Sequence, residues 1–116
     1  MQQRPNIVLI ISDQHRRDAS GCYGSRIVKT PNIDALARTG VRFNRSYCDS
    51  PLCAPSRASL ITGLRPHHHK ALWHAVNGLQ PGHEGNPGID CEKTIAEFLR
   101  DHGYDTAAIG KMHVHG

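Results

Sequence analysis

The sequence predicts an α/β fold with a mainly parallel sheet flanked by helices, and three observations indicate it. Residues 6–12 form an apolar, β-branched run, which is typical of a strand covered on both faces. Residues 104–109 form a second run that we interpret as a buried strand. Segments with helical spacing lie between these runs, and strands that alternate with helices are typical of parallel sheets.

The first helix is expected between Thr30 and Gly40. Thr30 can cap its start, Pro31 suits its first turn, and apolar residues follow at helical spacing. Residues 41–47 then alternate apolar and polar side chains, which predicts a half-buried strand.

The second helix is expected over residues 55–62. Pro55 suits its first turn, and Gly63 is placed to end it in a left-handed conformation. Residues 64–89 are rich in Pro, Gly, His and Asn without any periodicity, so they are predicted to form a long loop. A third helix is expected from a cap at Asp90 to about His102.

Composition and charge exclude several classes of protein. The 116 residues are 38% hydrophobic and 21% charged, which is ordinary for one globular domain and excludes a disordered, collagen-like or coiled-coil chain. The net charge of +4 comes from scattered basic residues, and only 5% of residues are aromatic. We therefore expect no nucleic-acid partner.

We expect no membrane-spanning or secretory segment in this sequence. Its longest apolar run, Ile7–Ile11, is far shorter than the roughly 18 residues that a membrane span needs. Four cysteines occur without a C-x-x-C pair or the density of a disulfide scaffold, so reduced thiols are expected. These features predict a cytoplasmic protein without a membrane partner.

Three segments place polar side chains just after a predicted strand or at the start of a predicted helix. They are Asp13-Gln14, Cys53 with Ser56-Arg57, and Lys111 with His113. Such positions meet at the ligand-binding edge of an α/β sheet. Carboxylate and amide oxygens suit a hard divalent cation, whereas lysine, arginine and helix N–H groups suit a tetrahedral anion.

The spacing of these residues supports a shared anion site. Lys111 and His113 are two residues apart, so in extended backbone their side chains project to the same face. The backbone N–H groups that follow Cys53 at a helix start can add to the charge of Arg57.

Residues 53–63, Cys-Ala-Pro-Ser-Arg-Ala-Ser-Leu-Ile-Thr-Gly, resemble the sulfatase signature C-x-P-S-R-x-x-x-L-T-G, with Ile61 in place of leucine. Residues 30–34 and the Gly-Lys-Met-His segment at 110–113 also resemble sulfatase blocks. The resemblance implies that residues 1–116 are the N-terminal part of a sulfatase catalytic domain. It implies an alkaline-phosphatase-like fold, incomplete at its C-terminal side, and a chain that is inactive in isolation.

The resemblance also implies roles for the candidate residues. A maturation enzyme would recognise Pro55 and Arg57 and oxidise Cys53 to formylglycine, the nucleophile that cleaves a small sulfate ester. Asp13, Gln14 and the modified Cys53 would bind a divalent metal, with Ca²⁺ ranked ahead of Mg²⁺ and Mn²⁺. Arg57 would stabilise developing charge.

Lys111 and His113 would hold sulfate oxygens or assist the leaving alcohol, again as the resemblance implies. Gln14 departs from the second aspartate of many sulfatases and resembles choline sulfatases and phosphonate monoester hydrolases. A phosphonate monoester or phosphodiester hydrolase is therefore an alternative. A non-catalytic anion-binding domain with unmodified Cys53 is another.

The histidines at 67–69 and 74 do not predict a zinc site. Consecutive histidines in extended backbone alternate faces, and no Cys or carboxylate lies at ligand spacing. Cys22, Cys48 and Cys91 are expected to pack or to be inert.

Overall fold

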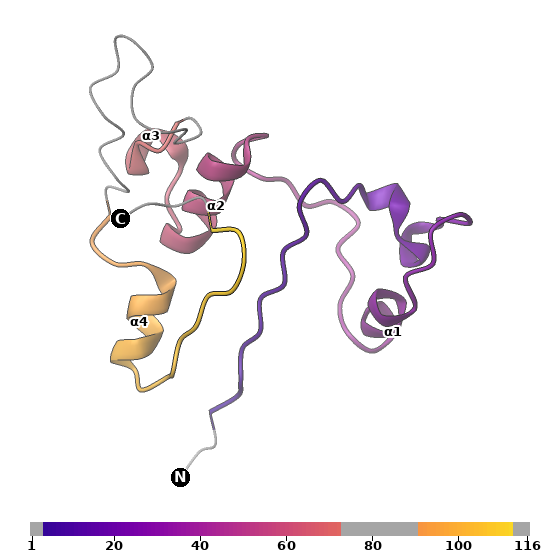
Figure 1. The fold of residues 1–116 in the computed structure, drawn as a ribbon, viewed down its shortest axis with the longest axis horizontal. Helices are drawn as coiled ribbons and strands as arrows, with labels where there is room; N and C mark the ends of the chain where they lie inside the picture. Colours follow the sequence, from indigo (N-terminus) through magenta and orange to yellow (C-terminus); the bar gives the residue numbers. More distant parts are fainter. Residues whose placement is uncertain (1–3, 73–90, 113–116) are drawn as a thin grey trace. The chain divides into compact units, whose positions relative to one another are not determined.

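The computed structural model describes residues 4–72 and 91–112, and the chain divides into two compact units, 1–46 and 47–116. Figure 1 shows its helices, and the described residues between them are irregular. The first unit contains η1 (Arg17–Ala19), η2 (Gly21–Tyr23) and α1 (Pro31–Thr39), and the second contains α2 (Cys53–Thr62), α3 (Pro66–His69) and α4 (Ile95–Asp101).

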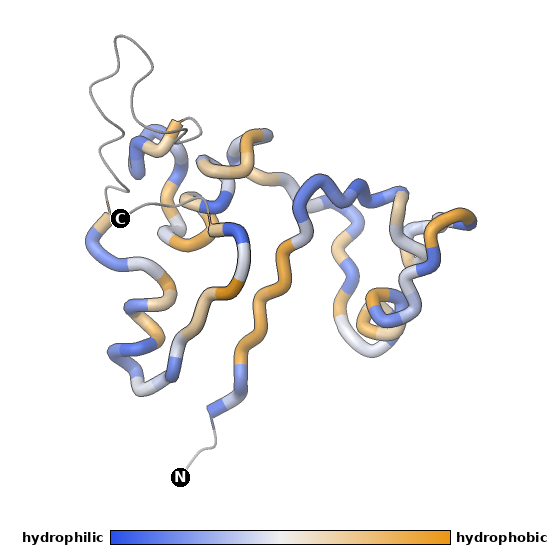
Figure 2. The backbone as a smooth tube through the Cα atoms, viewed as in Figure 1, coloured by the Kyte–Doolittle hydropathy of each residue, from blue (hydrophilic) through white to orange (hydrophobic). Residues whose placement is uncertain are grey.

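No strand forms among residues 4–72 and 91–112, so the predicted sheet is not observed there. Residues 4–12 run without a helix or turn, and Figure 2 shows their apolar stretch. Val8 and Ile10 are 80% and 82% exposed, whereas burial on both faces was expected. Branched side chains favour extended backbone, but a sheet requires a neighbouring strand to complete the hydrogen-bond ladder. The parallel sheet thus stays a prediction.

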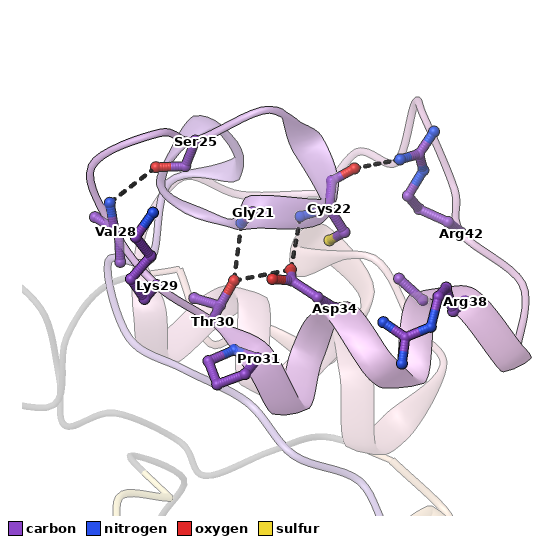
Figure 3. Close-up of a pocket in the computed structure, with 11 residues that line it drawn as sticks. Gly21, Cys22, Ser25, Val28, Lys29, Thr30, Pro31, Asp34, Arg38 and Arg42 are labelled. Atoms are coloured by element: carbon purple, nitrogen blue, oxygen red, sulfur yellow. Dashed lines mark hydrogen bonds between the residues drawn. The ribbon is translucent and has the colours of Figure 1, made fainter.

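The carboxylate of Asp34 organises the first unit. Its Oδ1 accepts hydrogen bonds from the Cys22 N–H at 2.6 Å and from the Thr30 hydroxyl at 2.9 Å. Thr30 Oγ1 in turn accepts from the Gly21 N–H at 2.8 Å, as Figure 3 shows. A Cβ atom on Gly21 would overlap with the Asp34 carboxylate, so a larger residue at this position would have to displace that carboxylate from its hydrogen bonds.

Side-chain hydrogen bonds explain why residues 41–47 are not a strand in this unit. Tyr23 donates its hydroxyl to the Phe43 carbonyl at 2.6 Å, and Arg17 donates to the Asn44 carbonyl at 2.7 Å. Arg42 donates to the Cys22 carbonyl. These side-chain contacts to residues 20 to 27 positions earlier in the sequence attach the segment to the rest of the first unit, where a strand pairing was predicted.

Helix α1 confirms the first predicted helix. Pro31 occupies its first position, and the Gly40 N–H closes its end on the Leu36 carbonyl at 2.9 Å. The Thr30 side chain makes no capping bond, contrary to expectation, because its hydroxyl is engaged by Asp34 and Gly21.

Helix α2 confirms the second predicted helix, although it begins at Cys53 rather than Pro55. Proline is tolerated there because the first turn of a helix makes no use of its missing N–H. Gly63 ends the helix with φ +71°, in the left-handed conformation that the sequence predicted. Ala54 and Ala58 are buried along this helix.

The predicted loop over 64–89 contains a short helix, α3, so this expectation is wrong at residues 66–69. Pro66 starts the helix, and it places the histidine run on helical rather than extended backbone. His69 is fully buried, whereas His67 and His68 are exposed. The rest of the predicted loop from residue 73, including His74, lies outside the described residues.

Helix α4 corresponds to the third predicted helix but starts later. Thr94 is its cap, because Thr94 Oγ1 accepts from the Glu97 N–H at 3.3 Å and Glu97 Oε2 accepts from the Thr94 N–H at 2.8 Å. This reciprocal pair of hydrogen bonds satisfies two N–H donors at the start of the helix, which makes it a stronger signal for a helix start than a single cap. The cap expected at Asp90 lies outside the described residues. Over the described ranges, no helix is long and apolar enough to cross a membrane.

We predict that replacing Asp34 with alanine loosens the first unit. The Cys22 N–H and Thr30 hydroxyl lose their acceptor, which should lower the free energy of local opening by about 1–3 kcal/mol. Hydrogen exchange at the Cys22 amide in the full-length protein measures this change. The control is Asp18→Ala, which removes only an exposed ion pair with Arg16 and should leave that exchange rate unchanged. Equal Cys22 exchange in both variants would contradict the role given to Asp34.

Candidate functional site

Cys53 is the first residue of α2, so it lies at the helix end that attracts negative charge. Leu52 precedes it in extended backbone and supplies the carbonyl that accepts from the Ser56 N–H at 3.1 Å. No side chain caps this helix start. The half-buried Cys53 thiol is therefore placed where an oxyanion on its side chain gains from the helix dipole.

Buried small residues hold this helix start against the rest of the second unit. Ala54 and Ala58 are 3% and 0% exposed, and Pro55 is fully buried beside them. Cys53, Ser56 and Arg57 are only half-buried, so the helix turns its packed face away from these functional candidates. Packing and chemistry thus use different faces of the same ten residues.

Arg57 links α2, which contains the signature residues, to the predicted site segment at Lys111. Its Nη1 donates to the backbone carbonyl of Lys111 at 2.7 Å, across 54 residues of sequence. Gly110, just before Lys111, adopts φ +92°, a conformation that favours glycine and turns the chain at this point. The structure therefore brings the Arg57 side chain into contact with the backbone of the Lys111 segment, and the roles predicted for these residues stay predictions.

The other predicted residues are not part of this contact. His113 lies outside the described residues, so its predicted role is untested. Asp13 and Gln14 belong to the first unit, whereas Cys53, Arg57 and Lys111 belong to the second. The grouping of Asp13 and Gln14 with Cys53 stays a prediction.

Gln14 has an unusual backbone conformation directly after the apolar segment. Its φ of +53° lies in the left-handed region, which a non-glycine residue seldom adopts. Strained residues of this kind cluster at functional sites. Asp13 and Gln14 are both exposed at this turn.

The donor chemistry of this turn fits a hard divalent cation in part. A carboxylate and an amide carbonyl are oxygen ligands of the kind that Ca²⁺ and Mg²⁺ prefer. Such ions take six or more oxygens, so two side chains supply only a fraction of a coordination shell. Among residues 4–72 and 91–112, no group of three or more His, Cys, Asp or Glu side chains is arranged to hold a metal.

His69 is a residue of this unit that the sequence analysis missed. Its Nε2 lies 3.0 Å from Ser59 Oγ on α2, and its Nδ1 accepts from the Ala71 N–H at 3.1 Å. Burial lowers the pKa of His69, and the nearby charges of His67 and Asp49 act in opposite directions on it. Pro66, placed shortly after the end of α2, was the sequence signal that a helical turn would fold this histidine back.

The cavity in Figure 3 has a different set of lining residues. It has a volume of about 540 Å³ and belongs to the first unit, between η2 and α1. Lys29, Arg38 and Arg42 line it together with Asp34, but none of the predicted site residues does.

Comparison with known proteins identifies the family. The sulfatase family model matches residues 5–116. The chain is 39% identical to human steryl-sulfatase over 96% of its length, and 39% identical to an arylsulfatase of Clostridium perfringens over 97%. It is 36% identical to an N-acetylglucosamine-6-O-sulfatase of Bacteroides thetaiotaomicron over 97%.

The chain spans about a fifth of the length of these relatives, 19%, 21% and 18% respectively. The matched range, residues 5–116, contains Asp13, Gln14, the residues of α2 and Lys111. This chain belongs to the sulfatase family.

Proposed function

We propose that the protein hydrolyses sulfate esters to an alcohol and sulfate, through a formylglycine made from Cys53. The observation that carries this proposal is the second unit's arrangement, with Cys53 at the start of α2 and Arg57 of the same helix bonded to the Lys111 segment. Relatives named as sulfatases support hydrolysis of sulfate esters in general.

The chemistry requires two oxygens on one carbon of residue 53. A maturation enzyme that recognises Pro55 and Arg57 would oxidise the Cys53 side chain by two electrons, with an oxidant that this enzyme uses, and the sulfur would leave as sulfide as the C–S bond breaks and the C=O bond of the aldehyde forms. Water then adds to the aldehyde to give two hydroxyls. One hydroxyl attacks the sulfur of the ester, and the alcohol leaves. The other hydroxyl then loses its proton, the carbonyl re-forms, and sulfate departs. The N-terminus of α2 and Arg57 stabilise the negative charge on residue 53.

Lys111 and His113 are the residues that we propose to act on the ester itself. Lys111 directly follows Gly110, whose φ is positive, and the backbone carbonyl of Lys111 accepts the hydrogen bond from Arg57. We assign it to the sulfate oxygens, because an ammonium group is a strong donor to an anion. His113 is assigned to the departing alcohol, which needs a proton.

A divalent metal, with Ca²⁺ ranked ahead of Mg²⁺ and Mn²⁺, is part of the proposal. When bound, it lowers the pKa of a hydroxyl on residue 53. Asp13 and Gln14 would hold it with oxygen atoms, beside the modified Cys53. Further ligands are needed beyond these, so we propose that the 116 residues alone show no turnover.

A second candidate follows from Gln14. An amide carries less charge than a second carboxylate, which leaves a phosphonate monoester or phosphodiester as a possible ester. Aryl sulfate and aryl phosphonate esters assayed side by side on the full-length protein distinguish the two. Faster hydrolysis of the sulfate supports the first proposal, and faster hydrolysis of the phosphonate replaces it with the second.

We predict that Cys53→Ala abolishes turnover of an aryl sulfate, and that Cys53→Ser allows at most one turnover per molecule. A serine has a single hydroxyl and cannot expel sulfate by re-forming a carbonyl. The measurement combines a burst assay with mass spectrometry of the peptide that contains residue 53. Exposed Cys48→Ser, in the same unit, is the matched control and should retain full activity. An intact Cys53 thiol in active protein would refute the mechanism. An intact Cys53 thiol in full-length protein that shows no turnover after co-expression with a maturation enzyme would favour a non-catalytic anion-binding role.

Arg57→Lys should lower kcat by about a hundredfold per formylglycine, because lysine keeps the charge but loses the planar, multi-donor geometry. Formylglycine content is measured by mass spectrometry and used to correct the rate, since Arg57 is also proposed to guide maturation. The control is Arg65→Lys, an exposed arginine that precedes α3 and should change neither quantity. A corrected rate equal to wild type would leave Arg57 with a role in maturation or folding alone.

Gln14→Asp should lower the concentration of Ca²⁺ that gives half-maximal activity, and Asp13→Asn should raise it. The first change adds a charged oxygen ligand and the second removes one. Aspartate also tolerates the left-handed backbone of position 14 better than glutamine does. Titration of chelator-treated protein measures both effects, with Asp18→Asn as the control. The same half-maximal concentration in all variants would remove this turn from the metal site.

A further inference from the structure

His69 is the buried polar side chain of the second unit within the described residues. Each of its ring nitrogens has a hydrogen-bond partner, Ser59 for one and Ala71 for the other. It is 0% exposed, although it is the third histidine of a run whose other members are exposed. Its ring lies between α3, which carries it, and Ser59 of α2, with Nε2 and Ser59 Oγ 3.0 Å apart. Its other nitrogen lies 3.1 Å from the Ala71 backbone nitrogen.

These partners determine which ring nitrogen carries the proton. The Ala71 N–H is only a donor, so Nδ1 must offer its lone pair and the proton of the neutral ring must be on Nε2. Nε2 therefore donates to Ser59 Oγ. A nitrogen that already holds a proton cannot remove one from the serine, so Ser59 and His69 are not a nucleophile and base.

The side chains packed around this hydrogen bond are small, so the bond contributes more than they do to fixing the orientation of α2. The buried residues of α2 are Ala54, Pro55 and Ala58, and Ala71 is the buried apolar residue beyond α3 in the described range. Small side chains interlock little, so they define the rotation and the axial position of a helix poorly. A buried hydrogen bond is directional, because its strength falls steeply as the angle departs from linear.

We propose that His69 is a positioning residue that sets the orientation of α2, and thereby of Cys53 and Arg57, through its hydrogen bond to Ser59. The proposal rests on the function proposed above. Ser59 lies two residues after Arg57 and six after Cys53 on one helix, which is about 9 Å along the axis. A continuous helix transmits a fixed rotation at Ser59 to its first residue.

The key comparison is between two substitutions of the same histidine. His69→Asn keeps an acceptor near Nδ1 for the Ala71 N–H but is too short to reach Ser59. His69→Gln places an amide N–H near Nε2 and so keeps the bond to Ser59. We expect kcat for an aryl sulfate, per formylglycine, to fall by about tenfold to a hundredfold in His69→Asn, with KM little changed. We expect His69→Gln to recover most of that loss.

The matched control is His68→Asn, a neighbouring exposed histidine on the same helix, which should behave as wild type. Ser59→Ala should reduce kcat as His69→Asn does, and the double variant should be no worse than either single one. Equal kcat in His69→Asn and His68→Asn overturns the proposal, even where His69→Asn is less thermostable. A His69→Gln variant as slow as His69→Asn also overturns it, because the Ser59 bond would then not be the cause.

A readout that needs neither maturation nor turnover separates this proposal from the function itself. In protein made without a maturation enzyme, Cys53 keeps its thiol. The rate at which iodoacetamide alkylates this thiol depends on the orientation of the first turn of α2, so it reports that orientation. Peptide mass spectrometry resolves this thiol from Cys22, Cys48 and Cys91. We expect His69→Asn to change the rate several-fold, and His68→Asn and His69→Gln to leave it near wild type. If the wild type shows no sulfatase activity, the proposed function fails and this rate alone decides the role of His69.

Discussion

The hydrogen bond from Arg57 to the Lys111 carbonyl is the contact on which the arrangement of the candidate site residues in the second unit depends. It joins the signature helix to a segment 54 residues later at 2.7 Å. An arginine can do this and still direct other N–H groups elsewhere, because the guanidinium has five donors in a fixed fork. One residue thus links the start of α2 to the segment that contains the candidate sulfate ligand.

Polar contacts rather than a large apolar core hold the described residues in place. The buried apolar side chains within residues 4–72 and 91–112 are small ones: Ala54, Pro55, Ala58 and Ala71. Asp34 in the first unit and His69 in the second each bind backbone and side chain together. Membership of the sulfatase family implies an alkaline-phosphatase-like α/β fold, in which apolar segments such as Ile7–Ile11 would gain strand neighbours and be buried.

Local rules of helix formation accounted well for α1 and α2. Pro31 with Gly40, and Pro55 with Gly63, predicted these helices because a first-turn proline and a terminal glycine act through backbone geometry alone. The start of α4 was missed, although Thr94 and Glu97 formed a recognisable capping box. The strand predictions did not correspond to observed strands, since the pairing of a strand depends on distant residues that no local pattern contains.

The sequence by itself determined the family and the chemical groups: a cysteine, a proline and an arginine at signature spacing, with oxygen donors after an apolar run. Spacing within one helix is set by the covalent chain, so Cys53 and Arg57 could be placed together without coordinates. Only the tertiary structure decided that Arg57 reaches the Lys111 carbonyl and that His69, alone of its run, is buried against Ser59. Both contacts arise from folding separate segments onto each other, which a linear pattern of residue types does not specify.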